Sequence, residues 1–81
     1  MEQSNTVVPQ QWFCIKLRVR GRTSEAFVTA VHTKEIYKVT KFSYGHRHEA
    51  QKLAKLTASK FAQSIRKFPF KEKVIVSVEK F

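Results

Sequence analysis

Residues 12–22, W-F-C-I-K-L-R-V-R-G-R, alternate between apolar and cationic side chains along most of their length. Successive side chains of a β-strand point to opposite faces, so this alternation predicts a strand with one buried face. The predicted core face consists of Phe13, Ile15, Leu17 and Val19. The opposite face carries an indole, a thiol and a row of cations: Trp12, Cys14, Lys16, Arg18 and Arg20. We expect the rest of the chain to support this strand and to present its basic face to a polyanion.

Composition limits the chain to one small basic domain. Its 81 residues allow a single core, and 42% hydrophobic residues are enough to pack one, which excludes wholesale disorder. Sixteen lysines and arginines against six acids give a formal net charge of +10. Such an excess attracts nucleic acid, an anionic membrane surface or an acidic protein. We expect nucleic acid, because a protein without an anionic partner usually carries more acids among its cations.

The N-terminal residues 1–11 are polar and contain Pro9, which predicts a flexible arm ahead of a single domain over residues 12–81. The opening M-E-Q-S-N-T lacks the apolar run of a signal peptide, and no stretch approaches the ~20 apolar residues of a membrane span. The single Cys14 cannot form an internal disulfide, which fits a reducing compartment. We expect a soluble intracellular protein without a membrane partner, nuclear if the source is eukaryotic and cytoplasmic if it is prokaryotic or phage.

Two further strands follow the first one. Residues 20–23, R-G-R-T, carry the glycine expected of a hairpin turn, and residues 25–33 return as the second strand. We assign its bulkier face to the core and the opposite face to a low wall beside the cations; a register slip of one residue would invert this. The core set is Phe27, Thr29 and Val31, and the opposite face, which is mostly small, is Ala26, Val28, Ala30 and His32. Residues 36–42 are the third strand.

One long amphipathic helix is predicted over residues 48–68, where apolar and small residues recur at intervals of three and four. Glu49 in the first turn complements the helix dipole, and Pro69 ends the helix. Alternation over residues 73–81 predicts a fourth strand, which pairs either with a sheet edge or with a second molecule in a homodimer. The expected fold class is α+β: a three-stranded antiparallel sheet packed on one long amphipathic helix, plus a C-terminal strand.

The sequence carries no pattern typical of catalysis. It lacks paired carboxylates, a Ser-His-Asp arrangement and a glycine-rich phosphate loop. Cys14 could form a nucleophile with a histidine, but it lies in mid-strand without a local activating motif. His46 and His48, separated by Arg47, supply two ligands and fall short of a zinc set. We expect no enzymatic activity, no cofactor and no metal.

The basic strand is the strongest functional pattern. Arginine makes bidentate contacts with guanine edges or phosphate, lysine neutralises phosphate, and an indole can stack on bases. The predicted nucleic-acid contacts are Trp12, Lys16, Arg18, Arg20, Arg22, Lys38, Lys41 and Arg47. The alternatives are a basic face that is only solvated and a Trp12 that packs into the core. The cations of the helix, including Lys60, are expected to attract a polyanion in general without reading it.

A further pattern combines Trp12 in an early strand, K-F-S-Y-G at residues 41–45, and Glu49, Ala50 and Ala54 at the helix entry. Over residues 12–68 it resembles the apetala/ethylene-response-factor family of DNA-binding domains, to which the arm-binding domain of phage integrases is related in fold. The resemblance implies that the three-stranded sheet enters the major groove of DNA. Carried over by position, it implicates Trp12, Lys16, Arg18 and Arg20, together with Lys38.

Two alternatives stay open. Residues 48–55, H-E-A-Q-K-L-A-K, are similar to the last helix of double-stranded-RNA-binding domains, where lysines meet phosphates. Leu56 among cations and residues 74–78 as a spare strand instead favour a small viral interaction module that docks on an acidic protein. The preferred expectation is a small factor of transcription regulation, of a virus or of a mobile element, which grips duplex DNA through the basic face of its sheet.

Overall fold

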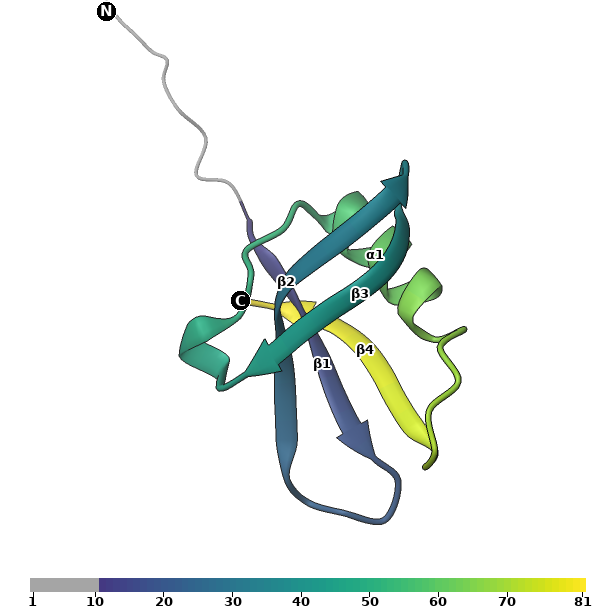
Figure 1. Cartoon of the computed structure of the whole chain (residues 1–81). Helices are drawn as coiled ribbons and strands as arrows, with labels where there is room; N and C mark the ends of the chain where they lie inside the picture. Colours follow the sequence, from purple (N-terminus) through teal and green to yellow (C-terminus); the bar gives the residue numbers. More distant parts are fainter. Residues whose placement is uncertain (1–10) are drawn as a thin grey trace, which may run out of the picture.

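The protein is an α+β fold in which a four-stranded antiparallel sheet packs against one helix (Figure 1). The structure is a computed structural model that describes residues 11–81, so the arm expected over residues 1–11 lies, except for Gln11, outside the described residues. The strands are β1 (Phe13–Val19), β2 (Glu25–Glu35), β3 (Lys38–Gly45) and β4 (Val74–Lys80), in the order β3-β2-β1-β4. A 3-10 turn, η1 (Arg47–Glu49), and the helix α1 (Lys55–Ile65) connect β3 to β4. No helix within residues 11–81 is long and apolar enough to cross a membrane.

Strand β1 lies inside the sheet and pairs on both sides, as its alternating sequence predicts. It is antiparallel to β4 along its whole length and to β2 over residues 16–18. Ile15 and Leu17 are buried in the main core. The turn to β2 has Gly21 at φ 87°, a conformation that glycine adopts readily, so the hairpin prediction is confirmed. Of the two pairings left open for the C-terminal strand, the structure shows pairing with β1 of the same chain.

Helix α1 packs on the inner face of the sheet and is shorter than predicted. It buries Ala58, Ala62 and Ile65 against the core. The prediction of a helix over residues 48–68 is wrong in its bounds, because α1 begins at Lys55 and ends at Ile65. Before Lys55, residues 47–49 form η1, and Gln51 and Leu53 hydrogen-bond to strands of the sheet. Phe13 and Leu53 exchange two hydrogen bonds, of 2.8 and 2.9 Å, where β2 has diverged from β1. A residue that extends a sheet in this way cannot also donate within a helix.

The faces of β2 are inverted over residues 26–28 relative to the prediction. Phe27 lies directly opposite Lys16 in the antiparallel register, so both side chains occupy the outer face. Val28 is buried in the main core, and Ala26 packs against it. A register shift between Val28 and Ala30 then returns Val31 to the core side, as predicted. The expected low wall beside the β1 cations is therefore replaced by a phenylalanine.

A second, smaller core covers part of the outer face. Cys14, Phe27 and Ala50 are buried together there, and the segment after β3 brings Ala50 to them. The Gln51 N–H donates to the Val28 carbonyl at 2.9 Å, which holds this segment beside β2. Ala50 was expected on the core face of the helix, but it serves this second cluster instead. The outer face of the sheet is thus partly closed where the sequence predicted an open basic surface.

Helix α1 also fastens both edges of the sheet. At the β3 edge, the Val39 N–H donates a hydrogen bond to Ser64 Oγ at 2.9 Å. At the β4 edge, Arg66 donates two hydrogen bonds to the Val76 carbonyl, from Nε at 3.1 Å and from Nη2 at 2.8 Å. Unpaired edge strands invite pairing with other chains. These contacts leave less of either edge free, including the edge of β4 that the sequence offered to a second molecule.

Candidate nucleic-acid interface

On the outer face of the sheet, Lys16 lies between two carboxylates. Its Nζ is 3.2 Å from Glu25 and 3.1 Å from Glu79, which flank it from β2 and β4. The hydrogen bonds to Glu79 and then to Glu25 raise the pKa of Lys16 above its usual value. Two acids around one cation leave little positive potential for an outside anion at this position.

Arg47 acts as a clasp over the same face. Its Nη1 is 3.3 Å from Glu79, and its Nη2 donates to the carbonyls of Lys80 and Phe81 at 3.3 and 3.0 Å. The guanidinium also lies 5.6 Å from the ring centroids of both Phe27 and Phe81, within cation–π distance. These contacts tie η1 to the end of β4. Because Arg47 makes these contacts within the fold, fewer of its hydrogen-bond donors remain for a ligand.

The Arg47 side chain covers the buried Cys14. Burial raises the pKa of this thiol above its usual value, with the nearby Arg47 acting in the opposite direction. A thiol that stays protonated is a poor nucleophile. Elsewhere in the described chain, no group of three or more His, Cys, Asp or Glu side chains could hold a metal ion, and His46 and His48 simply stack with their rings 5.8 Å apart.

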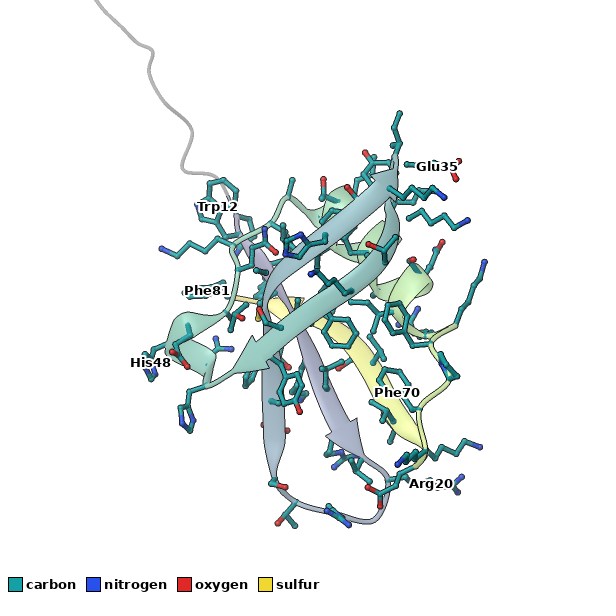
Figure 2. All side chains as sticks on the ribbon, in the orientation of Figure 1. Trp12, Arg20, Glu35, His48, Phe70 and Phe81 are labelled. Carbon is teal, nitrogen blue, oxygen red and sulfur yellow. The ribbon has the colours of Figure 1, made fainter. Side chains whose placement is uncertain are left out.

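The remaining predicted contacts do not gather on one surface. Arg20 lies at the β1–β2 turn. The β2–β3 turn, whose position Glu35 marks in Figure 2, is at a separate end of the molecule. Arg22 pairs with Glu72 at 3.1 Å. Trp12 is 40% exposed, between the two alternatives considered for it. Arg18 and Lys41 are exposed, on β1 and β3 respectively. Lys38 belongs to a different site.

That site is a groove between the β3 edge and helix α1, which we call the lysine groove. Three cations line it: Lys38 from the strand, and Lys60 and Lys67 from the helix and the turn after it. Its volume is about 540 Å³, and its other lining residues are Ile36, Tyr37, Val39, Thr40, Gln63, Ser64, Phe68 and Pro69. Within residues 11–81 no acid lines it, although Glu35 lies beside it, 3.7 Å from Lys38. Lys60 and Lys67 form no ion pair with any other described residue.

The groove ends at the β2–β3 turn, where two residues have unusual positions. Ile36 is 86% exposed, the highest value among the large hydrophobic residues that the structure describes. Tyr37 has φ 64°, a left-handed conformation that costs a non-glycine residue about 1 kcal/mol or more. Its ring packs edge-on against Phe61, with centroids 6.0 Å apart. The third strand was predicted from residue 36, but these two residues form the turn and β3 begins at Lys38.

Sequence reasoning named Lys38 but missed the rest of the groove. Lys60 was interpreted as general attraction, and Ile36 was placed in a strand. The available signal was the absence of any acid among residues 50–71, which contain six cations. Comparisons with known proteins add no identification, because no family model, no curated protein and no solved structure matches the chain.

Proposed function

We propose that the protein binds double-stranded nucleic acid, with duplex DNA preferred, and that the lysine groove rather than the outer face of the sheet holds the phosphate backbone. The observation that carries this proposal is the distribution of acids. On the outer face, Glu25 and Glu79 pair with Lys16 and Arg47. Among the described residues no acid lines the groove, and of its three lysines only Lys38 has a carboxylate partner, Glu35. Polyanion binding depends on cations that can exchange small counterions for phosphates, and a cation already paired with a carboxylate does this poorly.

The groove suits a phosphodiester backbone in its chemistry. Lysine ammonium groups neutralise phosphates, and the neutral amide donor Gln63 on the lining can hydrogen-bond to phosphate oxygens. The exposed Lys34, near the end of β2 that leads into the β2–β3 turn, adds positive charge beyond the groove. About four to six phosphate contacts would then give a steep dependence of affinity on salt, near 0.9 log unit per contact.

The experiment compares two double variants that each remove two charges. The first variant, Lys60→Gln with Lys67→Gln, removes both positive charges from the helix side of the groove. The matched variant, Arg18→Gln with Arg20→Gln, removes two positive charges from β1 and its turn. Fluorescence anisotropy is measured with duplex DNA, duplex RNA and single strands at two salt concentrations. We expect the groove variant to lose the greater affinity and to lower the salt slope by about two units.

Each outcome of that comparison decides something. A larger loss in the Arg18 and Arg20 variant would overturn the groove as the contact surface and favour the sheet, as the apetala-type resemblance implies. Tighter binding of duplex RNA than of DNA would replace the preferred ligand by the double-stranded-RNA alternative. An unmodified protein that binds no nucleic acid at low salt would overturn the proposal entirely.

Of the two sequence features that favoured a docking module, the spare strand now gives it less support. Its spare strand is β4, which pairs with β1, and the Val76 carbonyl on β4 accepts from Arg66. Leu56 remains exposed at 61%. One exposed leucine is ordinary for a protein surface. The proposal therefore stays with nucleic acid, and a role in regulation, in a virus or in a mobile element stays a prediction from the sequence.

A further inference from the structure

We propose that Ile36 is a wedge, which enters the minor groove of the bound duplex and inserts between two base pairs, so that the DNA is kinked. This role rests on the proposed function, since it names what one residue of that interface does. Architectural proteins place isoleucine, leucine or phenylalanine between base steps in this way, while nearby cations hold the phosphates. Three features of Ile36 support the role: its exposure, the stiffness of its turn and its cationic surroundings.

The chemistry of the turn is unfavourable for folding alone. Two-residue hairpin turns favour glycine, asparagine and aspartate, because these residues tolerate a positive φ. This chain has Ile36 and Tyr37 there, a β-branched and an aromatic residue, both of which prefer strands. Tyr37 nevertheless adopts φ 64°. The exposed isoleucine gains no burial in exchange. A single exposed apolar residue is ordinary, so what distinguishes Ile36 is its place in this turn, on the lining of the lysine groove.

The turn is also held in place, as a wedge requires. The Tyr37 ring packs against Phe61 of α1, so the hairpin end is braced by the helix. Within the hairpin, Thr40 Oγ1 donates to the His32 carbonyl at 3.1 Å. Figure 2 shows Glu35 at the free end of the β2–β3 hairpin, away from the body of the sheet. A wedge requires a rigid backbone, because a side chain on a flexible loop would fold back onto the protein surface instead of separating stacked bases.

Cations surround the wedge on the side that faces the groove. Ile36 lines the lysine groove together with Lys38, Lys60 and Lys67. Glu35 directly precedes it and pairs with Lys38 at 3.7 Å, so Lys60 and Lys67 are the groove cations without a carboxylate partner among the described residues. A backbone held along the groove would bring its duplex against the β2–β3 turn. The minor groove of B-form DNA is about 6 Å wide, so the wedge role includes widening of that groove as the duplex is kinked. The exposed Leu56 lies on the helix surface rather than at a turn, so it provides a matched control.

The test measures bending and affinity together on the full chain. A duplex of about 25 base pairs carries a fluorophore at each end, and energy transfer reports the end-to-end distance. We expect the unmodified protein to bend it by an angle within the range of about 20–90° known for wedge proteins. Ile36→Ala should abolish most of the bend and weaken binding about tenfold or more, the loss expected when an isoleucine side chain is no longer buried. Ile36→Phe should retain the bend.

Leu56→Ala serves as the control and should change neither bend nor affinity. Thermal unfolding should be the same for Ile36→Ala and the unmodified protein, because the side chain is 86% exposed, and this separates loss of the wedge from loss of the fold. If Ile36→Ala binds and bends the duplex like the unmodified protein, the wedge is wrong while DNA binding stands. The wedge is equally wrong if the unmodified protein binds the duplex without bending it. If the unmodified protein binds no duplex at all, the proposed function fails first.

Discussion

Replacing Arg66 by methionine tests how strongly the helix holds the edge of β4. Methionine keeps most of the apolar stem and removes the guanidinium, so both hydrogen bonds to the Val76 carbonyl are lost. A hydrogen bond that involves a charged group contributes about 1.5–3 kcal/mol. Both bonds reach one carbonyl, and Arg66 is exposed, so water can replace part of the loss. We therefore expect a fall of about 1.5 kcal/mol in the free energy of unfolding.

For a domain of this size, 1 kcal/mol corresponds to about 4–8 °C in melting temperature, so the expected shift is about 6–12 °C. Circular dichroism during heating and urea titration measures it, with an unchanged urea slope expected for a pure stability change. Lys67→Met is the matched control, since it removes the same charge one position later and the Lys67 side chain has no hydrogen bond to another described residue; its backbone N–H still donates to Ser64. We expect that control to stay within about 0.5 kcal/mol of the unmodified protein.

The two variants also differ in their expected association. Loss of the Arg66 contact frees the Val76 carbonyl on the outer edge of β4, and a free edge can pair with another chain. Sedimentation velocity should therefore show more self-association for Arg66→Met than for Lys67→Met. Equal stability of the two variants would refute the idea that Arg66 fastens the sheet, whatever their association.

Two further predictions concern the outer face of the sheet. Glu79→Gln removes the carboxylate shared by two cations, and we expect urea titration to show a loss of about 1 kcal/mol at low salt that shrinks at 0.5 M salt; a loss independent of salt would contradict an ionic role. Cys14 has a folded pKa raised above its usual 9.0, so its contribution to stability is complete below pH 9 and falls as rising pH ionises the unfolded thiol first. The unfolding free energy should fall between pH 8 and pH 10 with a smaller slope in Cys14→Ala, and an identical slope would contradict this.

The sequence predicted β1 correctly because alternation is a local property that survives in the sheet. It predicted the wrong face for Phe27 because the face depends on the register with β1, which places Phe27 opposite Lys16. The register shift after Val28 then made Val31 agree with the prediction, so the same strand was assigned wrongly in one half and correctly in the other. Neither the register nor the shift has a signature in residues 25–33 alone.

The prediction of where the helix starts was wrong for a related reason. The spacing of Ala50, Leu53 and Ala54 continues that of the true helix, so periodicity alone extends it backward. The helix does not extend backward because Leu53 pairs with Phe13, a contact between segments far apart in the chain. The observed N-cap is Ala54, whose side chain cannot cap, so the sequence held no local start signal at that point.

The candidate site shows the same division between local and distant information. The sequence identified the cations of β1 but not that Glu25 and Glu79 would converge on Lys16 from two other strands. It could not place Lys38 beside Lys60, because that neighbourhood depends on how α1 crosses the sheet. Charge composition predicted a polyanion partner, whereas the choice of the lysine groove as the proposed contact surface depended on the packing.

If the lysine groove binds DNA as proposed, variants of the helix segment should separate stability from binding. Ser64 and Arg66 reach back to the sheet edges, whereas Lys60 and Lys67 line the open groove without carboxylate partners among the described residues. A chain with a net charge of +10 repels itself, so removing the two groove lysines should leave its melting temperature unchanged or raise it. Residues retained at a cost to stability are typical of functional surfaces. A Lys60→Gln, Lys67→Gln protein that is at least as stable, yet weaker toward DNA, would therefore locate function in the groove; a less stable one would assign these lysines to the fold.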